Sequence, residues 1–238
     1  MTTIQVEAAS RPLRRDAARN MQKISAAAME VFAERGLAVS MSDVAERAGV
    51  GVGTVYRRFG DKQVLIDALF TVKIQEVTGL AWIAARQEDA AAALVEFVST
   101  VAEQLASNKG LRQIILAEDF RPSKTHAAAL DQLTSQTAVL VNKAKRTGWL
   151  REDFSATDFP LILMAIGAVR DFGGSQHPEL WRRLLRLTID GMLHEESQLP
   201  VGIEAPPALT RQQLHTVVQH RRTPPTVGDD RISRFHQP

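Results

Sequence analysis

The 238-residue chain contains no cysteine. This absence excludes disulfides, thiolate catalysis and sulfur-based zinc sites, and it agrees with a reducing compartment. No run of about 18 or more uncharged apolar residues occurs, so we expect no membrane span. The first 20 residues also lack the apolar core of a secretory signal. We therefore expect a cytoplasmic protein that does not contact a membrane.

Motifs for common catalytic, metal and cofactor sites are also missing. There is no Ser/His/Asp set, P-loop or His-Glu metal motif. Glu118 and Asp119 are adjacent, and neighbours on a helix point apart, which disfavours a carboxylate pair. His215 and His220 are five residues apart, a poor helical spacing for a metal pair. We expect no catalytic residue, no metal and no cofactor.

The net charge of +2 is unevenly distributed. Residues 1–62 carry ten basic and seven acidic side chains, residues 63–199 carry fourteen and seventeen, and the last 39 carry five and three. The excess positive charge, which favours contact with a polyanion such as DNA, therefore lies at the two ends of the chain. So small a difference is weak evidence for nucleic-acid binding by itself.

Hydrophobic spacing predicts helices along most of the chain, and hence an all-α fold. The first expected helix runs from an N-cap at Asp16 to Arg35, followed by a short one that begins at Ser40, with Asp43 in the capping-box position. Asp61 is expected to cap a long helix that ends near residue 85. The other expected helices cover 88–107, 110–118, 124–147, 157–173 (N-cap Ser155, with Pro160 in the first turn) and 178–195.

The last 39 residues differ in composition. They hold six of the ten prolines, and their one helix-like piece is 209–221. We expect residues 200–238 to be largely disordered, with one short helix.

The stretch "AERAGVGVGTVYRRFGDK" (45–62) places three glycines at alternate positions. A dinucleotide fingerprint needs G-x-G-x-x-G between a strand and a helix. Counted from Gly49, the third glycine position holds Thr54, and counted from Gly51 it holds Tyr56. The preceding segment is helical as well. Both spacing and context therefore exclude a nucleotide cradle.

The same stretch fits two helices joined by a tight turn. Gly49 permits the left-handed backbone that ends the first helix, and Val50 fills the turn. The second helix, Val52 to Phe59, buries Val55 and Phe59. Its other face presents Val52, Gly53, Thr54, Tyr56, Arg57 and Arg58. Such a face suits a DNA major groove and its phosphate edge, with Lys62 placed for a further phosphate contact.

These residues resemble the DNA-binding segment of tetracycline-repressor (TetR) family regulators. The matching pieces are "RPLRRDAARNMQKISAAAMEVFAERG", "SDVAERAGV" and "GTVYRRFGDKQVLIDAL", between Arg11 and Leu69. The resemblance implies an N-terminal three-helix helix-turn-helix domain that binds double-stranded DNA. It also implies a homodimer on a palindromic operator and a C-terminal helical domain that dimerises and binds a small effector.

The resemblance also assigns DNA contacts to individual positions. The base contacts would come from Val52, Gly53 and Thr54, the phosphate contacts from Tyr56, Arg58 and Lys62, and backbone contacts from Ser40 and Ser42. Arg57 either joins them or covers the neighbouring helix with its stem. Arg14 and Arg15 belong either to a DNA-contacting arm or to a soluble tail. Gly51 and Val52 depart from the family's usual Ser and Lys/Arg, which leaves the base preference open.

The spans "AKRTGWLREDFSATDFPLILMAIGAV" and "ELWRRLLRLTIDGML" look like the C-terminal half of SbtR-type members. By that resemblance, helices 157–173 and 178–195 form the dimer interface. The expected domains are a flexible basic arm (1–15), the DNA-binding domain (16–62), the effector and dimerisation domain (63–199) and the tail (200–238). Residues that would face a mostly hydrophobic effector, or be plain core, are Trp82, Phe97, Val101, Leu133 and Met164.

The sequence thus predicts a ligand-responsive DNA-binding dimer, most simply a repressor. Two other classes compete with it. One is an enzyme on a helical scaffold, which the missing catalytic motifs disfavour. The other is a DNA-binding protein without an effector, which would need a fully packed C-terminal half.

Overall fold

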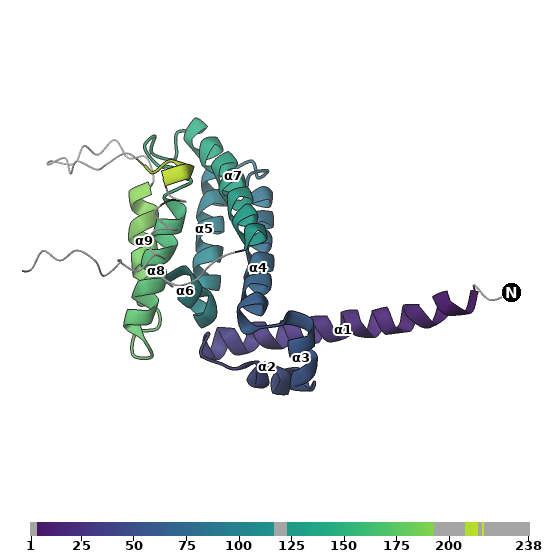
Figure 1. The fold of residues 1–238 in the computed structure, drawn as a ribbon. Helices are drawn as coiled ribbons and strands as arrows, with labels where there is room; N and C mark the ends of the chain where they lie inside the picture. Colours follow the sequence, from purple (N-terminus) through teal and green to yellow (C-terminus); the bar gives the residue numbers. More distant parts are fainter. Residues whose placement is uncertain (1–3, 117–122, 193–207, 214–215, 217–238) are drawn as a thin grey trace, which may run out of the picture.

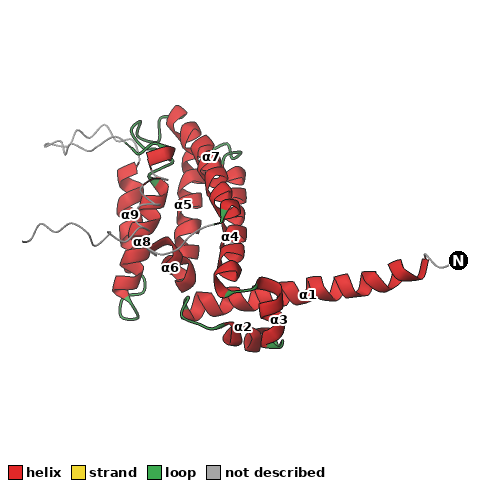
Figure 2. Cartoon of the chain, viewed as in Figure 1, coloured by secondary structure: helices red, strands yellow, loops and turns green. Residues whose placement is uncertain are grey.

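The computed structural model describes residues 4–116, 123–192, 208–213 and 216, and these form helices joined by turns (Figures 1 and 2). The expected all-α fold is confirmed. No helix in the described ranges is long and apolar enough to cross a bilayer. The helices are α1 (Ile4–Arg35), α2 (Met41–Ala48), α3 (Val52–Phe59), α4 (Lys62–Ala84), α5 (Ala90–Ser107), α6 (Lys109–Leu116), α7 (Lys124–Arg146), α8 (Phe159–Gly173) and α9 (Leu180–Met192).

The helices separate into a small unit and a larger bundle. Helices α1, α2 and α3 lie together at the lower end of α4, while α4, α5, α7, α8 and α9 run side by side above them (Figure 1). Within the bundle α4 packs along α7, and α8 packs along α9. The short helix α6 lies where the two parts meet and contacts both α1 and α8.

Each part has its own hydrophobic core, and α4 contributes to both. Leu65, Ile66, Leu69 and Phe70 belong to the core of the small unit, whereas the α4 residues from Val77 onward belong to the bundle core. The two cores therefore meet within α4, between Phe70 and Val77. As a result, a tilt of α4 must move groups in both cores.

Several helix starts differ from the sequence prediction, and α5, α8 and α9 begin two residues later than predicted, at Ala90, Phe159 and Leu180. Helix α1 begins at Ile4 and not after Asp16, so it includes Pro12, which disfavours a helix, together with alanines and arginines, which favour one. Residues 4–15 of the expected arm thus lie within α1. Ser155 is not the N-cap of α8: Asp158 is, and its carboxylate accepts the Ser155 N–H at 2.7 Å. Pro160 lies in the first turn of α8, as predicted.

Most of the expected tail lies outside the described residues, together with Glu118, Asp119, His215 and His220. Its described part contacts the bundle. The Thr157 hydroxyl donates to the Leu209 carbonyl at 2.6 Å, and Arg211 donates to the Ser135 hydroxyl at 3.0 Å.

Candidate nucleic-acid interface

A capping box fixes the start of α2, as the sequence predicts. The Ser40 hydroxyl accepts the Asp43 N–H at 3.2 Å, and the Asp43 carboxylate accepts the Ser40 N–H at 2.7 Å. Arg35 of α1 also pairs with Asp43, at 2.9 Å. Hydrogen bonds from the Ser40 hydroxyl and N–H, followed by that of Arg35, lower the pKa of Asp43 from 3.8 to about 2. The ionised carboxylate therefore holds the end of α1 and the start of α2 together.

The lowered pKa of Asp43 gives a testable pH dependence. A carboxyl whose pKa is lower in the folded state stabilises the fold above its unfolded pKa, and that contribution is lost as the pH falls from about 4 to about 2. We expect Asp43→Asn to remove this part of the acid destabilisation, which circular dichroism against pH would measure. The same loss of stability between pH 4 and 2 in protein and variant would contradict the role of Asp43.

Two ion pairs that the sequence pattern does not reveal also attach α2 to α1. Arg47 of α2 contacts Glu34 at 2.8 Å and Glu30 at 3.2 Å. Hydrogen bonding with these partners raises the pKa of Arg47 and lowers that of Glu34. Since the partners are more than ten residues apart, no local signal marks them.

The turn before α3 has the geometry that the sequence predicts. Gly49 adopts a left-handed conformation (φ 66°), and its N–H closes onto the carbonyls of the last turn of α2. Val50 is partly buried against the core of the small unit. Gly51 is the N-cap of α3 and offers no side-chain hydrogen bond, as its lack of a side chain requires. Val55 is fully buried and Phe59 packs beside it, so these two residues attach α3 to the core.

The opposite face of α3 is open to solvent. The side chains of Val52 and Tyr56 are 40% and 50% exposed, and Arg57 and Arg58 are exposed as well. A Cβ at Gly53 would meet no atom within 4 Å, so the backbone there can be approached closely. The helix contains no acidic residue. This face therefore offers an apolar group, bare backbone, a hydroxyl, a phenol and two guanidinium groups to a polyanion.

The cationic side chains around α3 also make contacts within the protein. Arg57 approaches the Thr54 hydroxyl on its own helix at 3.5 Å, and Arg58 donates to the Met21 sulfur of α1 at 2.8 Å. The Lys62 ammonium donates to the Leu37 carbonyl. An ammonium has three donors, so Lys62 retains two for another partner.

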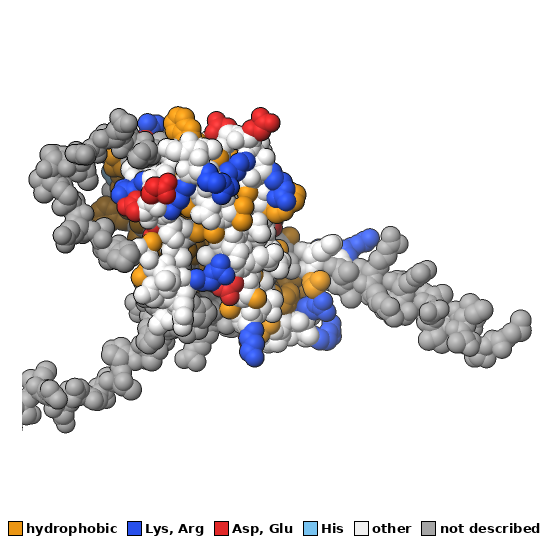
Figure 3. Space-filling model, turned by 90° about the horizontal axis from the view of Figure 1, so that it is seen from above, with side chains coloured by type: hydrophobic (Ala, Val, Ile, Leu, Met, Phe, Trp, Pro, Cys, Tyr) orange, Lys and Arg blue, Asp and Glu red, His pale blue; other side chains and the backbone are white. Residues whose placement is uncertain are grey.

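The other sequence-predicted DNA contacts flank this face. Ser40 and Ser42 are exposed at the start of α2. Arg14 and Arg15 lie in α1, but their side chains are outside the described part. Figure 3 shows the end of the molecule that points upward in Figure 1. There, acidic and basic side chains are mixed over the described surface, without the single sign of charge found on α3.

An apolar cleft lies between α4 and α5. Its volume is about 90 Å³, and it is lined by Leu80, Ile83, Ala84, Gln87, Ala93, Glu96, Phe97 and Thr100. Of the five residues expected to face an effector, Phe97 lines this cleft. Val101 is buried in the bundle core, Leu133 packs against that core and Met164 is half-buried.

Trp82 is not among the lining residues. Its side chain is 48% exposed, and the Arg86 guanidinium lies 3.3 Å from its ring centroid. The reason is helical geometry, because the lining residues of α4 follow a spacing of three and four that passes over Trp82.

Two protein-family models match the chain. "Bacterial regulatory proteins, tetR family" matches residues 24–69, and "Transcriptional regulator SbtR-like, C-terminal domain" matches residues 89–194. The first match spans the end of α1, all of α2 and α3 and the start of α4, and the second spans the bundle from α5 to α9.

Individual proteins agree with these models. An HTH-type transcriptional regulator of Staphylococcus aureus (strain USA300) is 43% identical over 54 residues, which are 22% of this chain and 29% of that protein. The TetR transcription regulatory protein from Mycobacterium vanbaalenii is 28% identical, with a TM-score of 0.56 over 77% of this chain and 100% of that one. FadR from Bacillus subtilis, solved in complex with stearoyl-CoA, shares the fold at 20% identity and a TM-score of 0.55, over 72% of this chain and 99% of that one.

Proposed function

Since the chain is a TetR family DNA-binding transcriptional regulator with an SbtR-like C-terminal domain, we propose that it binds a palindromic operator as a homodimer and that a small effector releases it. In this proposal it acts as a repressor, in the cytoplasm, and is not an enzyme. The observation that carries the DNA-binding part is the open, acid-free face of α3.

On this face, the three residues of the first turn of α3 are proposed to approach base edges, since the start of a recognition helix points into the major groove. Tyr56, Arg58 and Lys62 would hold phosphates. The remaining proposed contacts are those of Ser40, Ser42, Arg14, Arg15 and Arg57. Val52 cannot form the bidentate contact that an arginine makes with guanine, so discrimination at its base step would depend on apolar contact.

Arg58→Met tests the phosphate contact. The variant keeps an unbranched stem of similar length, removes one positive charge and can still pack on Met21. We expect weaker binding to operator and unrelated DNA alike, with the slope of log K against log salt reduced by about 2, which is about 1 for each protomer of the dimer. Fluorescence anisotropy over a range of salt concentrations measures both.

The matched control is Arg86→Met, at the other end of the bundle, where binding and salt slope should stay unchanged. An Arg58→Met protein that binds like the parent at every salt concentration would show that α3 does not face phosphates in the proposed way.

The homodimer is supported by apolar side chains exposed on α8 and α9. Leu161 and Phe172 of α8 are 43% and 86% exposed, and Leu180 and Leu187 of α9 are 37% and 58% exposed. Ala165 and Ala168 complete a single stripe along α8 between Leu161 and Phe172. A contiguous apolar surface of this kind marks an interaction site.

The effector part of the proposal is supported by the α4–α5 cleft and by one buried polar atom. The cleft is smaller than the roughly 300 Å³ or more of a typical ligand site, so an effector would have to widen it. Gln104 lies on the same face of α5 as Phe97 and Thr100, and its buried Oε1 has no hydrogen-bond partner in the described structure. We therefore propose a largely apolar effector that carries one hydrogen-bond donor.

In this proposal, the effector releases the operator through a movement of α4, because α4 contributes residues to both cores. A ligand shifts a conformational equilibrium only by its differential affinity for the two states, typically about 1–3 kcal/mol. Screening small apolar alcohols, phenols and amines for release of bound operator tests this part. If no compound that raises the melting temperature also weakens operator binding, the alternative of a DNA-binding protein without an effector is favoured.

A further inference from the structure

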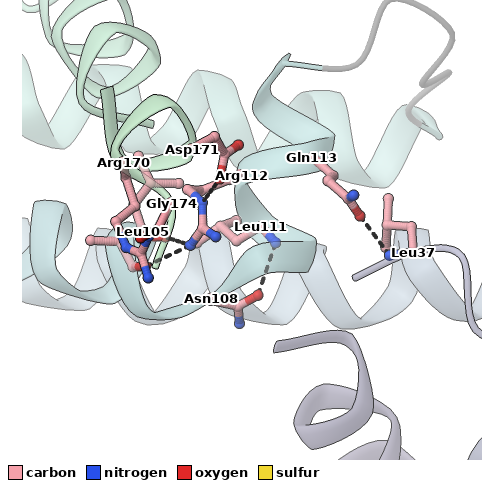
Figure 4. A network of polar contacts seen from close by, with 10 residues as sticks. Leu37, Leu105, Asn108, Leu111, Arg112, Gln113, Arg170, Asp171 and Gly174 are labelled. Carbon is pink, nitrogen blue, oxygen red and sulfur yellow. Dashed lines mark hydrogen bonds and ion pairs between the residues drawn. The ribbon is translucent and has the colours of Figure 1, made fainter. Parts of the chain in front are cut away.

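The turn between α1 and α2 is held from two sides. Gln113 of α6 accepts the backbone N–H of Leu37 with its Oε1 at 2.6 Å, and Lys62 at the start of α4 donates to the Leu37 carbonyl. Figure 4 shows the Gln113 side chain reaching out of α6 to this turn. Leu37 lies between the helix that supports the DNA-binding unit and the first helix of the helix-turn-helix. Side chains from α6 and α4 therefore fix its backbone.

Two glycines permit this contact. A Cβ on Gly110 would lie 2.9 Å from the Phe32 carbonyl oxygen, so the first turn of α6 approaches the backbone of α1 at a distance that only glycine allows. A Cβ on Gly36 would lie 2.4 Å from the Gln113 Oε1, and Gly36 has a φ of 79°. The backbone of α6 at Gly110 thus packs closely on α1 at Phe32, and the Gln113 side chain packs closely on the backbone of Gly36.

The residue before Gln113 attaches α6 to the other part of the protein. Arg112 is 6% exposed, and its Nε donates to Asp171 of α8 at 2.6 Å (Figure 4). Its Nη1 donates to the carbonyls of Ala106 and Leu105 in the last turn of α5, at 2.6 and 3.2 Å. A cation is favourable at a helix C-terminus, where carbonyls lack partners. Asp171 directly precedes Phe172, the most exposed apolar residue of the proposed dimer face.

Two adjacent residues of α6 therefore contact different parts of the protein. Arg112 contacts α8 of the proposed dimer face, and Gln113 contacts the turn between α1 and α2. From this geometry we infer that Gln113 is a positioning residue for operator binding. It sets the orientation of the DNA-binding unit relative to α8 and touches no DNA itself. The inference rests on the proposed homodimer, in which this orientation fixes the spacing of the two α3 helices, about 34 Å for successive major grooves.

The experiment compares Gln113→Met with Gln113→Glu in the full chain. Both substitutions keep the side-chain length, but only glutamate keeps an oxygen that can accept the Leu37 N–H. Binding is measured on a palindromic operator selected from random DNA, on variants of it with one base pair added to or removed from the spacer, and on a single half-site. Sedimentation velocity confirms that each protein remains a dimer.

We expect Gln113→Met to bind the palindrome about tenfold more weakly, with a weaker preference for the native spacing. Its affinity for the half-site and its salt slope should equal those of the parent protein. Gln113→Glu should restore the spacing preference. A lost contact with DNA would instead weaken half-site binding, and a merely structural defect would lower stability without changing the spacing preference.

The inference is overturned if Gln113→Met discriminates spacings as the parent does, or if Gln113→Glu behaves like Gln113→Met. Failure of the proposed DNA interface is distinguishable, since it appears in Arg58→Met as an unchanged salt slope and does not involve Gln113.

Discussion

Phe172→Asp is expected to turn the protein into a monomer and to weaken binding to a palindromic operator by a factor of about 10² or more, because two linked half-site contacts become one. The Phe172 side chain is 86% exposed in the isolated chain, so its replacement leaves no cavity. In a two-fold symmetric dimer the same patch of each copy meets its partner, so the variant would bring two carboxylates into an apolar contact. The effect should therefore appear in assembly and not in the stability of the monomer.

Val139→Asp is the matched control for this experiment. Val139 is an apolar residue of α7, 51% exposed, that lies outside α8 and α9. Sedimentation velocity at micromolar concentration gives the assembly state, and anisotropy gives the affinity for the operator and for a single half-site. A dimeric Phe172→Asp protein, or a Val139→Asp protein that dissociates equally, would show that the α8 stripe is not the interface.

The elements that the sequence predicts well follow local rules. The capping box of Ser40 and Asp43, the left-handed Gly49 and the cap at Asp61 each depend on residues within one turn of each other, and the structure confirms all three. The bounds of α3 and its buried residue Val55 follow from the same short-range signals. The exposed face of α3, which we propose for DNA binding, can therefore be predicted from local sequence alone.

What the sequence does not reveal depends on contacts between distant segments. Gln113 and Leu37 are 76 residues apart, and Arg112 and Asp171 are 59 apart. Neither pair has a local pattern, because each forms only after α6 has been placed between α1 and α8. Trp82 shows the same limit within one helix. Hydrophobicity alone places it in the core, whereas a rotation of about 100° per residue points it away from the cleft.

Gly53→Ala is expected to weaken operator binding about tenfold, or about 1.4 kcal/mol, while the protein itself becomes no less stable. Gly53 lies inside α3, and a Cβ added there would meet no atom of the protein within 4 Å. Alanine is favoured over glycine in a helix interior by roughly 0.5–1 kcal/mol. The intramolecular effect of the substitution is therefore favourable, and any loss of affinity must come from a methyl group that meets the DNA.

Gly79→Ala separates the two effects. Gly79 is also a helical glycine with open space around it, but it lies in α4, away from α3. Both variants should match or exceed the parent in thermal stability, and only Gly53→Ala should lose operator affinity. If both bind the operator like the parent, α3 lies too far from the base edges for a methyl group to matter. Base recognition by the first turn of α3 would then need side chains longer than those of Val52 and Thr54. The first turn contains none, so the proposed base contacts would be contradicted.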